Sequence, residues 1–169
     1  MVFRGIMKLR CKYFVICLLW LLLAAPFLEP AANAQGRDKP DDILLFGLKA
    51  YQDGFYDPAA DSLARYLRFK PDGPKAANVR YYLAEALRLS ERYKDARLAH
   101  IDFLARHPGD SRADKIRFHL AELYEKAGKL ANAAEEYSKV SKGPFRAESA
   151  YREALLRLKE KSWDKATAA

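Results

Sequence analysis

A short pattern recurs at regular intervals in this chain of 169 residues and constrains its fold more than any other feature. Each copy has a bulky side chain followed three positions later by alanine. The bulky residues are Tyr56, Tyr93, Leu130 and Trp163, spaced 37, 37 and 33 residues apart. Regular spacing of this size is typical of proteins that repeat one supersecondary unit along the chain. Everything after residue 40 is therefore expected to consist of such units.

Each unit has the pattern of a helical hairpin. Apolar residues after position 40 recur at helical spacing, and a first helix is expected from residue 41 to Asp53-Gly54, where glycine can adopt the left-handed conformation that ends a helix. A second helix is expected to begin at Asp57-Pro58, with Asp57 as its N-cap and Pro58 as its first residue, and to stop at residues 71–74.

Two more hairpins are expected at the same spacing. One spans residues 76–107 with its turn at 90–92, and the other spans 112–141 with its turn at 127–128. Residues 161–166 form a partial fourth copy, so a further helix is expected to begin near Trp163. No stretch alternates as a β-strand would, and the fold class is therefore predicted to be all-α.

The recurrent alanines are expected to lie where two helices approach closely. Ala59, Ala96 and Ala133 each fall about one turn into a second helix. Four residues later, on the same helix face, come Leu63, His100 and Tyr137. We expect these three larger side chains to fill the space above the alanines.

In this order of residues the chain resembles the tetratricopeptide repeat (TPR) family. The first match comprises Phe46-Gly47, Gly54, Tyr56, Ala59, Leu63 and Pro71; the second comprises Leu83-Ala84, Tyr93, Ala96, Phe103 and Pro108; the third comprises Leu120-Ala121, Tyr124, Gly128, Ala133 and Tyr137. The resemblance covers residues 41–169. It implies a right-handed superhelix of antiparallel helix hairpins, with about three and a half repeats.

The chain departs from the family pattern in two respects. Its first two spacings exceed the usual length of about 34 residues, and the loops at 71–74 and 108–111 can absorb the difference. The last unit stops at Ala169, which indicates a C-terminally truncated repeat domain. The repeat spacing and the leader also resemble those of exported bacterial members of the family. These members are the cell-division coordinator of the Tol-Pal system and a lipoprotein of outer-membrane assembly.

The first 34 residues have the pattern of a secretory signal. Four basic residues precede an uncharged apolar run, and Ala32-Asn33-Ala34 forms a small-x-small exit, so cleavage is expected after Ala34. Residues 35–40 are polar and are expected to form a flexible lead-in. The protein is thus predicted to be periplasmic. The alternative is an uncleaved N-terminal anchor, which would provide its only membrane contact.

Charge and cysteine content restrict the function further. Both cysteines, Cys11 and Cys17, lie in the leader, so the exported part must fold without disulfides. Without the leader the chain has 26 basic and 21 acidic residues, a net charge of +5. These charges are mixed along the helices with no long basic block, and a nucleic-acid partner is not expected.

No arrangement of residues predicts catalysis, a cofactor or a metal. His100 and His107 lie seven residues apart, unlike helical metal ligands at i and i+4, and His119 has no second ligand in phase on its own helix. The serines lack a nucleophile-elbow setting, and no glycine loop could cradle a phosphate. The chain is therefore predicted not to be an enzyme.

A partner-binding groove is the remaining candidate site. In the family the first helices line a concave wall, and the positions here that match are Leu44, Tyr81, Phe118 and Tyr151, with Arg88 among the charged residues of the rim. Aromatic groups supply large contact area for a peptide or helix. The alternative is that these side chains pack between hairpins as core.

The sequence therefore favours an exported, non-catalytic TPR adaptor that binds a protein or peptide partner in the cell envelope. One alternative is the N-terminal scaffold of a longer envelope enzyme. Another is a component of outer-membrane assembly or transport.

Overall fold

The computed structural model describes residues 39–167, with side chains described for residues 39–161. The expected signal peptide and nearly all of the expected lead-in lie outside these residues. The described part contains seven α-helices and no β-strand, so the all-α prediction is confirmed. The helices are α2 (Pro40–Gln52), α3 (Tyr56–Phe69), α4 (Ala76–Leu89), α5 (Tyr93–Arg106), α6 (Ala113–Lys126), α7 (Leu130–Ser138) and α8 (Arg146–Thr167).

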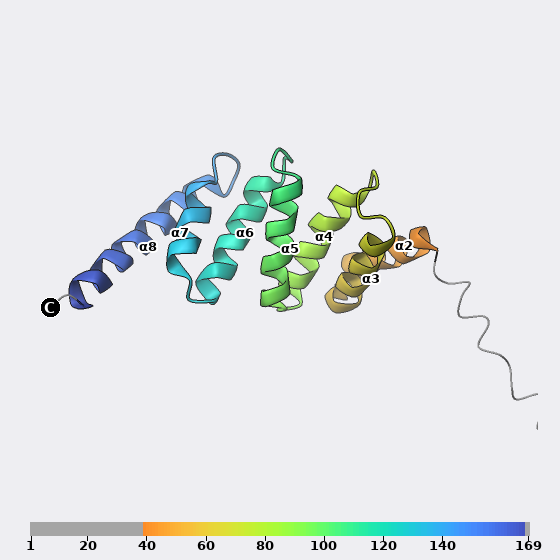
Figure 1. Ribbon diagram of the computed structural model, residues 1–169, viewed down its shortest axis with the longest axis horizontal. Helices are drawn as coiled ribbons and strands as arrows, with labels where there is room; N and C mark the ends of the chain where they lie inside the picture. The colour runs from red at the N-terminus through yellow and green to blue at the C-terminus, as the bar shows by residue number, and fades with distance from the viewer. Residues whose placement is uncertain (1–38, 168–169) are drawn as a thin grey trace, which may run out of the picture. The chain divides into compact units, whose positions relative to one another are not determined.

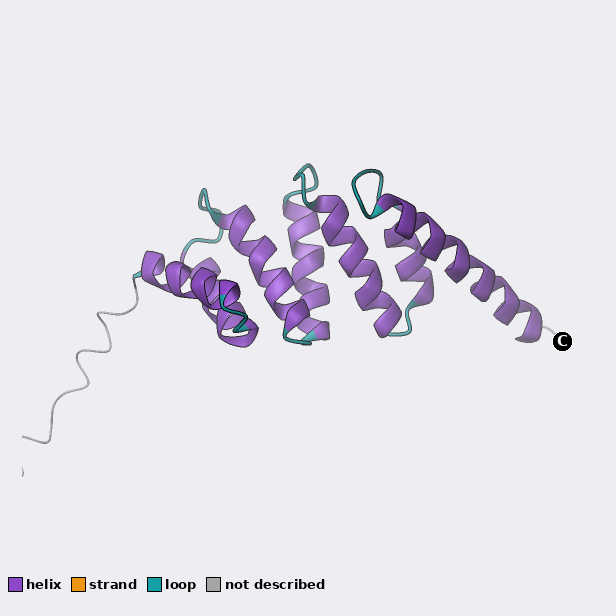
Figure 2. Ribbon diagram, turned by 180° about the vertical axis from the view of Figure 1, so that it is seen from behind, coloured by secondary structure: helices purple, strands orange, loops and turns teal. Residues whose placement is uncertain are grey.

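The helices pack in chain order as adjacent pairs (Figures 1 and 2). Pairs α2/α3, α4/α5 and α6/α7 are joined by short turns, and each pair is followed by a longer loop. This arrangement is compatible with a helical repeat. It matches the three hairpins expected from the sequence, with boundaries within a few residues.

The three short turns share one backbone geometry. Gly54, Glu91 and Gly128 have positive φ angles of 83°, 61° and 71°. In the first turn, the Gly54 amide donates to the Tyr51 carbonyl at 3.2 Å and the Phe55 amide donates to the Ala50 carbonyl at 2.8 Å. The other two turns have the same pair of bonds. This is the Schellman arrangement, which satisfies the last carbonyls of a helix and reverses the chain.

Two expected helix boundaries were wrong. Helix α3 begins at Tyr56, its N-cap is Phe55, and no side chain caps it. The Schellman turn has already reversed the chain there, so the helix begins before Asp57 and Pro58. At the other end, α8 continues through residues 161–164, where a turn was expected before Trp163. No glycine is present to take a positive φ at this point, and the helix continues.

The recurrent alanines lie in helix contacts, as predicted. Ala59, Ala96 and Ala133 are each 0% exposed. Ala59 and Ala96 belong to one core cluster with residues of α2, α4 and α6. A similar close approach occurs at Gly47 on α2, where an added Cβ would lie 3.1 Å from the side chain of Leu63 on α3. Small side chains thus allow neighbouring helices to pack closely.

Candidate functional site

The five predicted groove residues do not form one exposed ladder. Leu44 is 5% exposed and packs with Leu63 and Tyr66. Phe118 is 6% exposed, with its ring 4.7 Å from that of Phe145. These two side chains occupy core positions, which is the alternative that the sequence left open. The other three are accessible: Tyr81 and Arg88 are half-buried on α4, and Tyr151 on α8 is 61% exposed.

Tyr81 and Arg88 belong to a polar network between α4 and α6. The hydroxyl of Tyr81 accepts a hydrogen bond from Lys115 Nζ at 2.8 Å. Lys115 also lies 3.4 Å from Glu85 Oε2, and Arg88 Nη2 lies 3.3 Å from the same oxygen. Glu85 is 2% exposed, so a buried carboxylate joins the two predicted residues.

Two histidines approach the other oxygen of that carboxylate. His119 Nδ1 on α6 lies 2.7 Å from Glu85 Oε1, and His100 Nε2 on α5 lies 3.6 Å from it. Burial alone would raise the pKa of Glu85, but the contacts with His100 and His119 and the charge of Arg88 outweigh it and hold that pKa far below its usual range. We call Glu85, His100 and His119 the Glu85 cluster.

A related contact joins α6 to α8. Arg152 Nη1 donates to Glu122 Oε1 at 3.2 Å and to the Tyr137 hydroxyl at 3.0 Å. Its guanidinium carbon lies 5.3 Å from the ring centroid of Phe118. Carboxylates at equivalent positions of the first helices, Glu85 and Glu122, thus meet basic side chains of the following first helix. Phe118 lies beneath such a contact and is not free to touch a partner.

A cleft lies at the turn ends of α5 and α6. It has a volume of about 680 Å³, and we call it the Tyr93 cleft. Its lining residues are Glu91, Arg92, Tyr93, Lys94, Asp95, Arg97, Leu123, Lys126, Ala127 and Lys129. A smaller pocket of about 230 Å³ shares Glu91, Tyr93, Leu123 and Lys126 with it and adds Arg88, Leu89 and Glu122. The predicted residue Arg88 is therefore next to this cleft.

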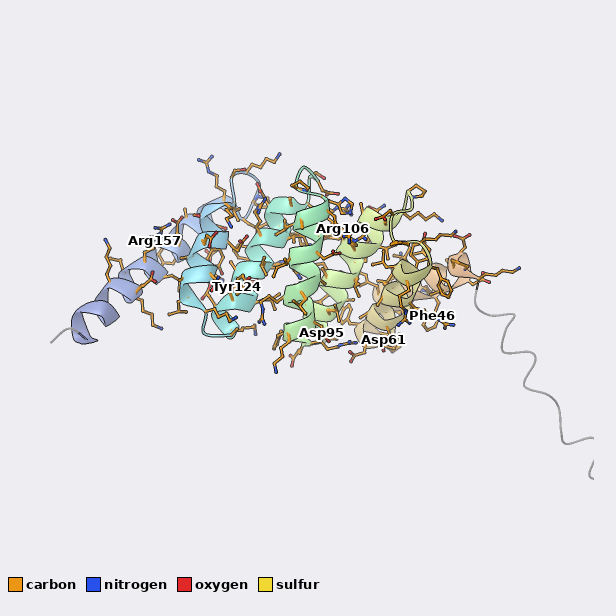
Figure 3. The ribbon with its side chains drawn as sticks, in the orientation of Figure 1. Phe46, Asp61, Asp95, Arg106, Tyr124 and Arg157 are labelled. Atoms are coloured by element: carbon orange, nitrogen blue, oxygen red, sulfur yellow. The ribbon has the colours of Figure 1, made fainter. Side chains whose placement is uncertain are left out.

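One cationic side chain of the cleft lies over its aromatic ring, and another pairs with nearby carboxylates. Lys126 Nζ lies 4.6 Å from the centroid of Tyr93. Arg92 donates to Asp61 at 2.8 Å and to Asp95 at 3.2 Å. Figure 3 shows Asp61 and Asp95 at neighbouring ends of α3 and α5, which Arg92 therefore joins. The floor of the cleft is formed partly by buried Leu123.

Sequence reasoning missed this cleft. Tyr93 was assigned to the repeated turn pattern, and Arg97 and Lys129 carried no signal of their own. A cleft between two hairpins depends on how α5 and α6 pack, which a pattern within one helix does not reveal. A cleft with an apolar floor and charged walls can bind an extended or helical peptide segment.

Comparison with protein-family models gives no match, and comparison with curated proteins gives no significant match. Within residues 39–167, no helix combines the length and the apolar character needed to cross a lipid bilayer.

Proposed function

We propose that the chain is an exported, non-catalytic adaptor of the tetratricopeptide-repeat type that binds a peptide segment of a partner protein in the cell envelope. In this proposal the three hairpins and α8 form a right-handed superhelix. Support comes from the 37-residue spacing of the Schellman turns and from the buried alanines at equivalent positions. Export rests on the leader pattern in the sequence alone.

The Tyr93 cleft is the single observation that carries the binding function. Five of its lining residues are cationic and two are acidic. One of the acidic residues, Asp95, is already paired with Arg92. The apolar and aromatic part is formed by Tyr93 and Leu123. This combination fits a peptide that alternates carboxylate and apolar side chains, because positive walls attract the former and the floor buries the latter.

A charge-reversal experiment tests the proposal. The probe is a fluorescein-labelled peptide of alternating Glu, Leu and Phe, and its binding is measured by fluorescence anisotropy. The double variant Arg97→Glu/Lys129→Glu is expected to bind about tenfold more weakly, because each exposed ion pair contributes up to roughly 1 kcal/mol. The wild-type affinity is also expected to fall as salt screens these charges.

A matched control separates the cleft from net charge. Lys142 and Lys161 are exposed and do not line the cleft. The variant Lys142→Glu/Lys161→Glu has the same total charge as the cleft variant and is expected to bind the peptide like the wild type. Equal weakening in both variants would reject the cleft as the binding site. No detectable binding by the wild type would reject this peptide chemistry.

A photo-crosslinking experiment addresses the natural partner. A photoreactive phenylalanine analogue at Lys126, in the cleft, is compared with one at Ala64, which is exposed on α3 outside the cleft. After irradiation in an envelope extract, a discrete crosslinked band is expected only from position 126. The band is expected to disappear when Arg97→Glu/Lys129→Glu is added.

A further inference from the structure

The Glu85 cluster brings together ligand-type atoms from three different helices. Glu85 lies on α4, His100 on α5 and His119 on α6. One donor atom from each, a carboxylate oxygen or an imidazole nitrogen, lies within 4.8 Å of the other two. The three residues are 2%, 0% and 7% exposed. Two imidazoles and one carboxylate form a common protein ligand set for zinc.

The tautomer of His100 supplies an independent indication of a ligand. His100 Nδ1 lies 2.7 Å from the carbonyl oxygen of Ala96, which can only accept, so Nδ1 carries the hydrogen. In the neutral imidazole, His100 Nε2 then presents a lone pair to the centre of the cluster. This nitrogen is buried and has no hydrogen-bond partner. A buried polar atom without a partner destabilises the fold, and a bound cation at this point would satisfy it.

This backbone contact is also the arrangement that prepares a histidine for metal binding. A hydrogen bond from one ring nitrogen to a carbonyl fixes the ring and leaves the other nitrogen as ligand. His119 is held differently, because its Nδ1 contacts Glu85 Oε1 at 2.7 Å. A metal would take the place of the proton between these two atoms, and that proton would go to solvent.

The two carboxylate oxygens of Glu85 differ in their nearest neighbours. Arg88 and Lys115 lie 3.3 and 3.4 Å from Oε2. Oε1 faces the histidines and also lies 3.5 Å from Arg88 Nε. This contact is long, so Oε1 can bind a metal while the cations hold Oε2. Hydrogen-bonded support of this kind is usual behind metal-binding carboxylates. The two nearby positive charges reduce the affinity for a dication but leave the ligand atom itself available.

The distance between His100 Nε2 and Glu85 Oε1 is close to the one that a small ion requires. Zinc lies about 2.0–2.2 Å from nitrogen and oxygen ligands, so tetrahedral ligand atoms are about 3.3 Å apart. The separation of 3.6 Å between His100 Nε2 and Glu85 Oε1 is near this value, and the His119 contact of 2.7 Å must open slightly. Calcium and magnesium are disfavoured, because they prefer oxygen ligands.

We propose that Glu85, His100 and His119 form a binding site for a divalent transition-metal ion of the zinc class. The ion has three protein ligands, and water completes its coordination. It joins α4, α5 and α6, and thus fixes the second hairpin against the first helix of the third. The site is independent of the peptide-binding function proposed above.

Cobalt and zinc titrations test the site directly. The purified chain, produced without a histidine tag and treated with a chelator, is titrated with Co²⁺ and then with Zn²⁺. The expected result is one equivalent of Co²⁺ with visible d–d absorption, displacement by Zn²⁺, and a Tm that rises with zinc concentration. Absence of both the absorption band and the Tm rise in the wild type overturns the proposal.

Variants locate the ion. His100→Gln and His119→Gln are expected to weaken zinc binding more than about tenfold, since loss of a ligand exceeds the usual effect of its supporting groups. His107→Gln is the matched control, because His107 is half-buried on the loop after α5 and outside the cluster. Binding that persists in both ligand variants, or falls equally in the control, overturns the assignment.

A measurement on the wild type decides the case even if the variants do not fold. Long-range ¹H–¹⁵N correlation spectra report each imidazole nitrogen. Zinc is expected to shift the resonances of His100 Nε2 and His119 Nδ1 and to leave those of His107 unchanged. Shifts confined to His107, or none at all, contradict the site.

Discussion

Asp110 binds both the backbone and the side chain of Arg112. Its Oδ1 accepts from the Arg112 amide at 2.9 Å and from Nε at 2.8 Å, and its Oδ2 accepts from Nη2 at 2.7 Å. The guanidinium so held lies 4.6 Å from the ring centroid of Tyr81 and donates to Asn78 at 2.9 Å. One carboxylate in the loop before α6 therefore fixes the contact between the second and third hairpins.

The first prediction is an acid-dependent loss of stability at Asp110. Hydrogen bonds from the Arg112 side chain lower the pKa of this carboxyl to about 2, and burial opposes them only in part. In the unfolded chain the pKa is about 3.9. Because the folded-state pKa is the lower one, the stabilisation is complete above about pH 5 and is lost as pH falls from about 4 to 2.

Asp110→Asn is expected to lower the free energy of unfolding at neutral pH by about 1–2 kcal/mol, as hydrogen bonds to a charged group are lost. The gap between variant and wild type should close near pH 2, as measured by urea unfolding at several pH values. Asp57→Asn is the control, because Asp57 lies 3.9 Å from Arg92 and is 64% exposed. A gap that stays constant from pH 7 to 2 contradicts the prediction.

The second prediction concerns the three Schellman turns. Glu91 has a φ of 61°, whereas glycine occupies the equivalent position in the other two turns. Glu91→Gly is expected to raise the free energy of unfolding by up to about 1 kcal/mol. The reason is that relief of the strain of a left-handed backbone exceeds the entropic cost of glycine.

Gly128→Ala makes the opposite change at the equivalent position. It should lower the free energy of unfolding by about 1 kcal/mol. No atom lies within 4 Å of the Cβ added there, so a steric clash does not confuse the result. Thermal unfolding measures both. If both substitutions change the free energy of unfolding in the same direction, the positive φ is not the cause of these stability changes.

The third prediction concerns close helix packing. Ala96 is 0% exposed and packs with residues of neighbouring helices, whereas Ala131 on α7 is exposed. Ala96→Leu is expected to destabilise by about 1–3 kcal/mol through overpacking. Ala131→Leu makes the same chemical change on the surface and should stay within about 0.5 kcal/mol of the wild type. Similar effects at both positions, measured by urea unfolding, would contradict the role of alanine in the contact.

The turns and the buried alanines could be predicted from sequence because their causes are local. Gly54 and Gly128 end helices through their own backbone freedom, and the position of Ala96 follows from counting one helical turn. The turn expected before Trp163 is absent for a local reason too, because α8 has no residue suited to a positive φ there. Asp57 is not the N-cap because the preceding turn places the start of α3 two residues earlier than expected.

The Glu85 cluster could not be predicted from any single helix. His119 has no second member of the cluster on α6, and the other two members come from α4 and α5. Their meeting depends on the rotation of each helix about its axis, which is set by packing across the whole array. A signal did exist, since Glu85 and His119 lie 34 residues apart, as do Tyr81 and Lys115. Pairs at about one repeat length indicate which side chains face each other between successive first helices.

Packing between helices also decides which of the predicted groove residues are buried and which are exposed. Helical phase places Leu44 and Phe118 on equivalent faces with Tyr81 and Tyr151, but the neighbours differ from repeat to repeat. Phe118 is covered by Phe145 and Arg152, whereas Tyr151 is 61% exposed. Equivalent positions in a repeat are therefore not equivalent in burial.

The last prediction concerns a buried hydroxyl between α6, α7 and α8. Tyr137 is 0% exposed, donates to Glu125 Oε1 at 2.5 Å and accepts from Arg152 Nη1 at 3.0 Å. Tyr137→Phe is expected to destabilise by about 1–2 kcal/mol, because it leaves two partners with fewer hydrogen bonds. Tyr151→Phe removes a hydroxyl from an exposed ring and should have an effect below about 0.5 kcal/mol.

A pH series distinguishes the hydroxyl from simple packing. Burial, together with the bond to Glu125, raises the pKa of Tyr137 above its usual value. A raised folded-state pKa gives stability that is present below the unfolded pKa of about 10 and is lost as pH rises further. Wild type should therefore lose more stability than Tyr137→Phe above about pH 10, as measured by urea unfolding. A parallel decline in both proteins would show that the hydroxyl does not contribute through its protonated form.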